Sequence, residues 1–333
     1  MAISSRVQLG SFTVIAILLA TVSPVVLAQP AVAATCSGTQ IAAGASIQAA
    51  IDAHGTGTTF CLTAGTYRVS SAIRPKSYDT FVGTGITRDN TTVRTSSAQV
   101  IFETDGTTGV NFRHFAVAGA INACPGSNCG ETGTGISRGT SVTVDDMHLY
   151  NNGLNGVGGG NGTLTVKNSE IDHNGAAIDG VSGGIKRIDP LTVTNSYIHD
   201  NKGNGIWCDM QCGSFIVTGS TVTGNTGGGI FDEISEGSSV IANNIVKGNN
   251  TTNSYNLGGI SVVDSKNVNI YGNTLGGNIR FGIGAAMDSR VNCGTPTSRC
   301  GYVLSNVSIH DNTPNGDALQ GCSLTGVTCT RNP

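Results

Sequence analysis

Between Ser141 and Asn312 the chain repeats one pattern of apolar and polar positions. Each segment starts with an aliphatic residue, carries a second one five positions later and has an asparagine three positions after that. The leading residues are Val144, Val166, Val193, Val217, Ile241, Ile270 and Leu304. The second residues are Leu149, Ile171, Ile198, Val222, Val246, Leu275 and Ile309. The asparagines are Asn152, Asn174, Asn201, Asn225, Asn249, Asn278 and Asn312.

The spacing of these asparagines sets the size of the repeating unit. Successive asparagines are 22, 27, 24, 24, 29 and 34 residues apart, so one unit is about two dozen residues and the excess lies in loop insertions. Glycine and asparagine are poor helix formers, and apolar residues within each strand segment recur every second position, which excludes helical repeats. Short strands cannot bury a core alone, so the units must stack, with asparagine above asparagine at a turn.

A further strand signal follows each asparagine. Gly-Ile or a close variant occurs at Ile206, Ile230, Ile260 and Ile283, with Val157 and Ile178 in the equivalent positions of the earlier units. The segment SGGIKRID at 182–189 is then expected to be a loop insertion.

Three segments carry a resemblance to a known family: LTVTNSYIHDNKGNGIWCDMQC, FIVTGSTVTGNTGGGIFDEIS and GASIQAAIDAHGTGTTFCLTAGTYRV. They resemble the pectate-lyase-like parallel β-helix superfamily, in particular bacterial secreted right-handed β-helix repeat proteins. The resemblance implies an all-β fold, a right-handed single-stranded parallel β-helix. The third segment is similar to the N-terminal cap of that family, with a short helix around Ile47 to Ala53 and then a first strand at Gly65 to Tyr67. The resemblance is specific for fold and weak for activity, because the superfamily holds lyases, hydrolases, epimerases and binders.

The N-terminus has the pattern of an export signal. Arg6 precedes the apolar run TVIAILLA at 13–20, and small residues follow at 31–35. This order predicts a secretory signal peptide over residues 1–34 and a β-helix domain over 35–333. No later stretch is long and apolar enough to span a bilayer, so we expect a secreted, extracellular protein.

The ten cysteines fall into local pairs. The pairs are Cys36 and Cys61, Cys124 and Cys129, Cys208 and Cys212, Cys293 and Cys300, and Cys322 and Cys329. None of them matches the double CxxC spacing of a zinc site, and export favours disulfides.

Charge is nearly balanced, with 18 Lys and Arg against 21 Asp and Glu, which argues against nucleic-acid or membrane partners. We expect a monomer.

Strand alternation singles out one group of side chains. If Ile206 and Ile230 point inward, the side chains of the next residues point to solvent. The side chains expected to be exposed in this way are Trp207, Phe231, Asp209 and Glu233. An exposed indole beside a carboxylate pair suits a sugar ring, so Trp207 and Phe231 are predicted to bind substrate.

The carboxylates Asp209 and Glu233 allow two kinds of chemistry. They could bind Ca²⁺, the candidate cofactor, or act as the acid pair of a retaining glycosidase. Asp179 is expected in register with Trp207. The resemblance implies a lysine or arginine as the base that removes a sugar C5 proton, and the candidates for this catalytic role are Lys186, Arg187 and Arg280.

Two histidines lie in segments that can be compared with a pectate lyase sequence. EIDHN, ending in His173 and Asn174, resembles a WIDH sequence of pectate lyases, but the equivalent slot of the next unit has His199 followed by Asp200. Both histidines are therefore interpreted as turn residues of the repeat. GHG and HExxH sequences are absent, which disfavours polygalacturonase-type hydrolases and zinc proteases.

The leading hypothesis is an extracellular lyase that cleaves an acidic, uronate-containing polysaccharide. One alternative is a non-catalytic carbohydrate-binding or surface protein. A second is a glycoside hydrolase that uses Asp209 and Glu233.

Overall fold

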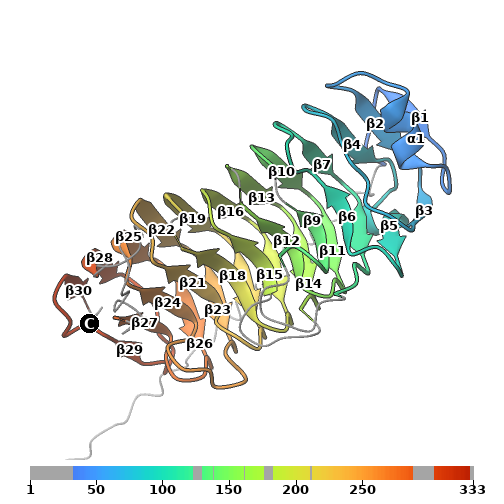
Figure 1. Ribbon diagram of the computed structural model, residues 1–333. Coiled ribbons are helices and arrows are strands. Elements are labelled where there is room, and N and C mark those ends of the chain that lie inside the picture. Colours follow the sequence, from blue (N-terminus) through green and yellow to red (C-terminus); the bar gives the residue numbers. More distant parts are fainter. Residues whose placement is uncertain are drawn as a thin grey trace, which may run out of the picture. The chain divides into compact units, whose positions relative to one another are not determined.

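The described residues between 33 and 330 form a solenoid of three parallel β-sheets, each of which takes one strand from most of the coils (Figure 1). The computed structural model describes residues 33–122, 130–137, 139–160, 162–175, 183–210, 212–287 and 304–330. The sheets are called A, B and C, and the chain visits them in that order. Nearly every strand pairs with the equivalent strands of the preceding and following coils, which confirms the predicted all-β parallel solenoid.

Sheet A has twelve strands. They are β1 (Thr39–Ile41), β2 (Thr59–Leu62), β4 (Thr80–Gly83), β7 (Asn111–Arg113), β10 (Val142–Asp145), β13 (Leu164–Lys167), β16 (Leu191–Thr194), β19 (Ser214–Thr218), β22 (Ser238–Ala242), β25 (Lys266–Tyr271), β28 (Ser305–His310) and β30 (Val327–Cys329).

Sheet B has nine strands. They are β3 (Gly65–Val69), β5 (Thr91–Thr95), β8 (Ala116–Ala118), β11 (His148–Tyr150), β14 (Glu170–Asp172), β17 (Tyr197–His199), β20 (Thr221–Thr223), β23 (Ile245–Lys247) and β26 (Thr274–Gly276).

Sheet C also has nine. They are β6 (Val100–Glu103), β9 (Thr134–Ser137), β12 (Asn155–Gly159), β15 (Gly183–Arg187), β18 (Asn204–Asp209), β21 (Ile230–Glu233), β24 (Ile260–Val263), β27 (Ile283–Ala286) and β29 (Leu319–Gln320).

A short helix covers the first coils, as predicted. Helix α1 (Ile47–Asp52) begins after Ser46, whose side chain accepts a hydrogen bond from the Ala49 backbone N–H. Its two isoleucines, Ile47 and Ile51, are buried against the core. The predicted strand at Gly65 to Tyr67 is β3, although β1 and β2 precede it.

Asparagine side chains stack between sheets B and C, which confirms their architectural role. Asn174 is fully buried and donates from Nδ2 to Asn201 Oδ1 (3.0 Å), and Asn201 donates in the same way to Asn225 (3.0 Å). Each amide also bonds to backbone groups, for example Asn201 Nδ2 to the carbonyl oxygen of Ile171. The ladder therefore satisfies backbone groups that the turn would leave unpaired in the interior.

The sequence pattern aligned Ile309 and Asn312 with the turn between sheets B and C, and this alignment was wrong. Ile309 pairs with Ile270 in sheet A, and Asn312 accepts from Asn273 in a second ladder between sheets A and B. The ladder between sheets B and C ends instead on the carboxylate of Asp317, which accepts from Asn278. Both turns need buried hydrogen-bonding side chains, so asparagine alone does not identify which turn a segment forms.

The segment interpreted as a loop insertion is a strand. Strand β15 contains Ile185, which pairs with Ile206, and Lys186, which pairs with Trp207. Lys186 therefore holds the register position that was expected for Asp179, and Asp179 lies outside the described residues. The Gly-Gly-Ile of β15 is the same local signal as in β18 and β21, and variable loop length hid its register.

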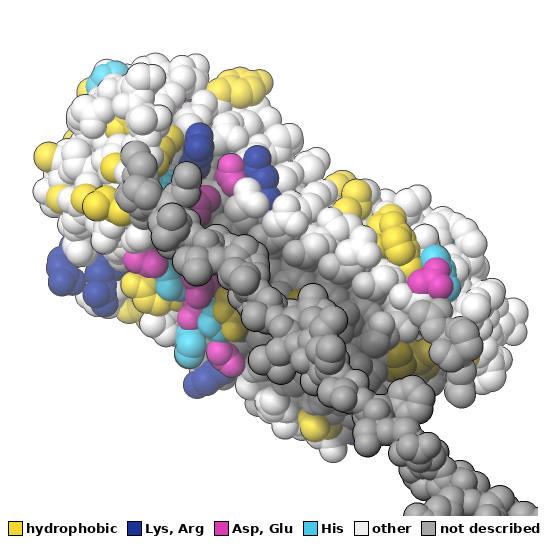
Figure 2. Space-filling view, turned by 180° about the vertical axis from the view of Figure 1, so that it is seen from behind, with side chains coloured by type: hydrophobic (Ala, Val, Ile, Leu, Met, Phe, Trp, Pro, Cys, Tyr) yellow, Lys and Arg dark blue, Asp and Glu magenta, His cyan; other side chains and the backbone are white. Residues whose placement is uncertain are grey.

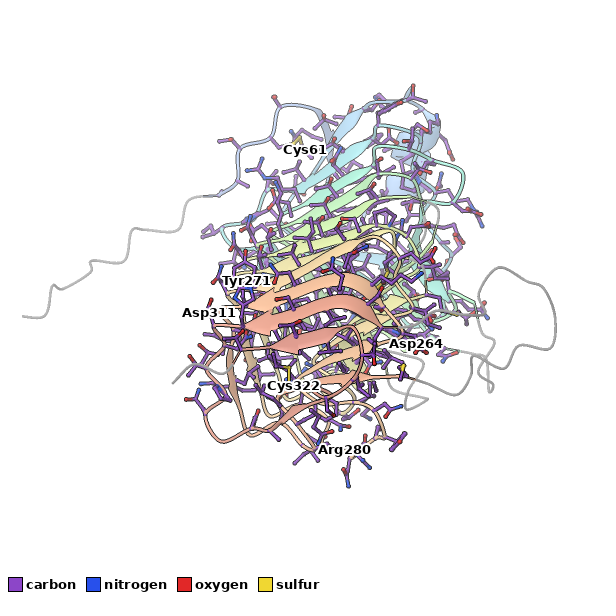
Figure 3. The ribbon with its side chains drawn as sticks, turned by 90° about the vertical axis from the view of Figure 1, so that its left-hand side faces the viewer. Cys61, Asp264, Tyr271, Arg280, Asp311 and Cys322 are labelled. Carbon is purple, nitrogen blue, oxygen red and sulfur yellow. A yellow bond between two sulfur atoms is a disulfide. The ribbon has the colours of Figure 1, made fainter. Side chains whose placement is uncertain are left out.

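Disulfides join neighbouring cysteines as predicted. Cys36 pairs with Cys61, Cys208 with Cys212, and Cys322 with Cys329. Cys61 and Cys322 lie toward opposite ends of the coil stack (Figure 3). The two remaining predicted pairs lie outside the described residues, as does most of the predicted signal peptide. Within the described ranges, none of the helices is long and apolar enough to cross a membrane.

One carboxyl group lies inside the coil. Asp232 of β21 is fully buried, and the Ser265 hydroxyl group donates to its Oδ1 at 3.4 Å, with Ser235 and Ser239 nearby. Burial raises the pKa of this carboxyl, although the hydroxyl groups lower it in part. Folding thus favours the protonated acid. Its stabilising contribution is complete below the unfolded-state pKa and is lost as the pH rises through the higher folded-state pKa.

Asp232→Asn should gain stability relative to the wild type as the pH rises. Asparagine has nearly the same shape and no charge to desolvate, so the difference should grow by up to about 1.4 kcal/mol per pH unit between the two pKa values. Urea denaturation of both proteins from mildly acidic to mildly alkaline pH measures this difference. A difference that does not vary with pH would contradict the interpretation.

Candidate functional site

The outer face of sheet C carries the predicted group of side chains. Lys186, Trp207 and Phe231 are in register on β15, β18 and β21, and Asp209 is in register with Glu233 two positions further along. Trp207 and Phe231 form a small apolar cluster that is separate from the coil interior. The strand alternation was therefore predicted correctly for this face.

The polar groups of this face contact one another directly. Lys186 Nζ lies 3.0 Å from Asp209 Oδ2 and 4.0 Å from the centre of the Trp207 ring. Trp207 Nε1 donates a hydrogen bond to Glu233 Oε2 at 2.9 Å. The indole therefore holds both a cation and a carboxylate in place, and Lys186 reaches one of the two predicted acids.

The expected exposure of these residues was wrong. Trp207 is 8% exposed and Phe231 7%, and Asp209 and Glu233 are 9% and 2% exposed. Phe231 stacks on Trp207 with ring centres 5.7 Å apart, and Leu257 packs against the same cluster. Alternation gives the side of the sheet on which a residue lies, but loops and neighbouring strands decide how much solvent reaches it.

Arg187 does not reach this site. It is 1% exposed and pairs in β15 with Cys208 of β18, whose side chain belongs to the coil interior. Its guanidinium donates to the carbonyl oxygens of Gly139 and Gly162. Because adjacent strand residues point to opposite faces, Lys186 and Arg187 could not both reach one site.

Arg280 is also separate from the carboxylate pair. It lies in the turn before β27, donates from Nε to the Asn253 carbonyl oxygen at 3.0 Å and lies over the Tyr255 ring. Its side chain points away from the coils (Figure 3). Asp209 and Glu233 lie at the other end of the sheet C strands, so the structure does not bring Arg280 to them.

A second group of charged side chains, missed from the sequence, lies on the outer face of sheet B. His148 Nε2 is 2.6 Å from Asp172 Oδ1, His199 Nε2 is 3.3 Å from Glu170 Oε1, and Arg88 also bonds Glu170. We call these residues, with Asp89 and Asp200, the sheet B cluster. A signal was present: the triplets HLY, EID and YIH align in register, which places their outer residues side by side.

Hydrogen bonds set the protonation of this cluster. Burial tends to raise the pKa of Glu170, but the bonds from Arg88 and His199 outweigh it, and the pKa is lowered. Burial also tends to raise the pKa of Asp172, but the hydrogen bonds that its carboxylate accepts from His148 and His173 lower this pKa overall. For His148, burial lowers the pKa, but its two carboxylate partners raise it overall. His173 lies in a left-handed turn conformation, which agrees with its interpretation as a turn residue, but the same interpretation of His199 was wrong because His199 lies in β17.

Comparison with known proteins agrees with the architecture. Residues 83–245 match the family described as the right handed beta helix region. This match agrees with the parallel β-helix that the three sheets form. No curated protein sequence matches this chain significantly.

Several solved structures are similar in fold. The tailspike protein 2 enzymatically active domain of bacteriophage CBA120 has a TM-score of 0.52 and 15% identity, covering 86% of this chain and 51% of that one. An alginate lyase from Paenibacillus sp. has a TM-score of 0.49 and 17% identity, covering 87% and 98%. The mannuronan C-5 epimerase AlgE4 A-module of Azotobacter vinelandii has a TM-score of 0.45 and 16% identity, covering 87% and 95%.

Proposed function

We propose that this chain is an extracellular polysaccharide-active β-helix protein that cleaves a uronate-containing polysaccharide by β-elimination on the outer face of sheet C. The contact between Lys186 Nζ and Asp209 Oδ2, 3.0 Å long and beside Glu233, carries the proposal. β-Elimination needs a base for the C5 proton and an acid for the leaving oxygen. A lysine and a carboxylate in contact can supply both.

The proton movements follow from this pair. Transfer of one proton from the Lys186 ammonium to Asp209 gives a neutral amine and a carboxylic acid. The amine takes the C5 proton, the C5–H electrons form the C4–C5 double bond, and the C4–O bond breaks. Asp209 protonates the departing oxygen, so the ion pair is restored. Because both groups lie on one side of the sheet, they would act on the same face of the sugar ring.

Trp207 is assigned a positioning role in this proposal. Its two faces contact Lys186 and Phe231, and its N–H bonds Glu233, so it holds the lysine and the second carboxylate. A sugar could stack on it only if Lys186 moved aside. The substrate-binding role predicted for the indole is therefore replaced by support of the reacting groups.

The carboxylate of Glu233 suits Ca²⁺ as a cofactor in its donor type, whereas Asp209, the second carboxylate predicted to bind the ion, is used here as the proton donor. Ca²⁺ takes six to eight oxygen ligands, and Glu233 offers carboxylate oxygens on the strand next to Asp209. Substrate oxygens would complete the set. When bound, the ion would neutralise the uronate carboxylate and so make the C5 proton more acidic.

Asp209→Asn should reduce lyase turnover by about 10³-fold, because asparagine cannot protonate the leaving oxygen. The assay follows the ultraviolet absorbance of the unsaturated uronate product with pectate, alginate and glycosaminoglycans, each with and without Ca²⁺. The matched control is Asp311→Asn, which changes an exposed carboxylate that bonds His310 and should leave turnover unchanged.

Other outcomes would replace the lyase proposal. New reducing ends without the absorbance, lost in Asp209→Asn, would indicate a hydrolase that uses Asp209 and Glu233. Binding of a polymer without any cleavage would indicate a carbohydrate-binding protein.

A further inference from the structure

The sheet B cluster lies on a different face from the proposed lyase site. Its side chains come from β11, β14 and β17 and from the 3₁₀ helix η1 (Arg88–Asn90). Acidic, histidine and basic side chains gather on this part of the surface (Figure 2). The proposed lyase chemistry does not use any of them.

Each of two histidines is held between two carboxylates. His148 Nδ1 is 2.6 Å from Asp89 Oδ1, and its Nε2 is 2.6 Å from Asp172 Oδ1. A neutral imidazole has one N–H donor and one lone pair. If Nδ1–H donates to Asp89, the lone pair of Nε2 faces a carboxylate oxygen, and a cation or a second proton must lie between the two acceptors.

His199 repeats this arrangement two coils further on. Its Nδ1 is 2.8 Å from Asp200 Oδ2, and its Nε2 is 3.3 Å from Glu170 Oε1. The two Nε2 atoms thus face carboxylates that are neighbours on β14. An outer carboxylate on Nδ1 is the arrangement that orients metal-binding histidines and fixes their tautomer.

Charge also favours a bound cation at this place. Four carboxylates surround the two imidazoles, namely those of Asp89, Glu170, Asp172 and Asp200. Arg88 pairs with Glu170 and also contacts Asp146, a fifth carboxylate. With neutral imidazoles, the cluster therefore has an excess of negative charge that a divalent ion would reduce.

We propose that His148 Nε2, Glu170 and Asp172 bind a divalent transition-metal ion of the zinc class. The ligand atoms of these three residues lie within 4.8 Å of one another. Three protein ligands with water in the fourth position are a common arrangement for Zn²⁺. Imidazole ligands favour Zn²⁺ over Ca²⁺, which takes oxygen ligands.

The ion would connect three successive coils. Its ligands come from β11 and β14, Asp89 adds the η1 segment through His148, and His199 of β17 joins through its contact with Glu170. Such a link stabilises the folded state because the unfolded chain does not hold the ligands together.

The test uses the full chain after removal of metal with a chelator. Isothermal titration with Zn²⁺ should show one site per chain, and Co²⁺ should give the visible absorption of a four-coordinate site. His148→Ala and Asp172→Asn should each weaken binding by at least about 100-fold, and Asp89→Asn by about 10-fold. Circular dichroism before titration identifies any variant that fails to fold, and the milder Asp89→Asn then still tests the site.

The matched control is His310→Ala. His310 has the same local arrangement, with Nδ1 2.8 Å from Asp311, but its Nε2 faces the Asn269 amide at 3.0 Å instead of a carboxylate. Its loss should leave zinc affinity unchanged. Absence of stoichiometric binding to the wild type would overturn the proposal and indicate that protons balance the cluster. Equal weakening by His310→Ala would also overturn it. Both results are independent of lyase activity.

Discussion

Asn201→Asp is expected to lower the free energy of unfolding by about 4 kcal/mol, because it leaves several buried acceptors without a donor. The Asn201 amide donates to the carbonyl oxygens of Ile171 and His199 and to Asn225 Oδ1, each at 3.0 Å. Asn201 Oδ1 in turn accepts from the Nδ2 of Asn174. Aspartate has the same shape but places an oxygen against three oxygens in a fully buried position.

Asn306→Asp is the matched control for this variant. Asn306 also donates to an asparagine of a neighbouring coil, Asn267 of the preceding one, at 2.9 Å, but the pair is exposed to solvent. Water can replace the lost bond there, so we expect a change within about 0.5 kcal/mol. Urea denaturation followed by circular dichroism measures both variants. Similar losses for the two would show that burial of the ladder is not the source of its stabilisation.

Lys186→Met is expected to reduce lyase turnover by about 10⁴-fold, because Lys186 supplies both the base and the proton that Asp209 delivers. Methionine keeps the length of the side chain and its packing over Trp207. Turnover is measured by the same product absorbance on the substrate that the wild type cleaves. Lys247→Met, which removes an exposed lysine of β23, serves as control and should be neutral.

Lys186→Arg separates proton transfer from simple charge attraction. Arginine keeps the positive charge near Asp209, but it does not give up its proton in proteins. If Lys186 acts as the base, this variant should be as inactive as Lys186→Met. Recovery of activity in Lys186→Arg would mean that the lysine binds the uronate carboxylate and that another group removes the C5 proton.

The fold and one face of the site could be read from local patterns. The period of about two dozen residues, the asparagine ladder, the cap helix and the pairing of Asp209 with Glu233 all depend on residues close together in one or two coils. Two assignments failed for an identifiable reason. Loops of variable length hid the register of β15, and asparagines at both turns made Asn312 ambiguous.

The local pattern is enough to show that this chain stacks short strands, because the alternation and the turn residues repeat along the coils. What the outer side chains contact depends on the tertiary structure. The alternation could not show that Trp207 is covered or that Lys186 meets Asp209. In the sheet B cluster, Arg88 bonds a carboxylate 82 residues away. Such contacts depend on how coils and loops lie against one another, and no periodicity within the sequence specifies that arrangement.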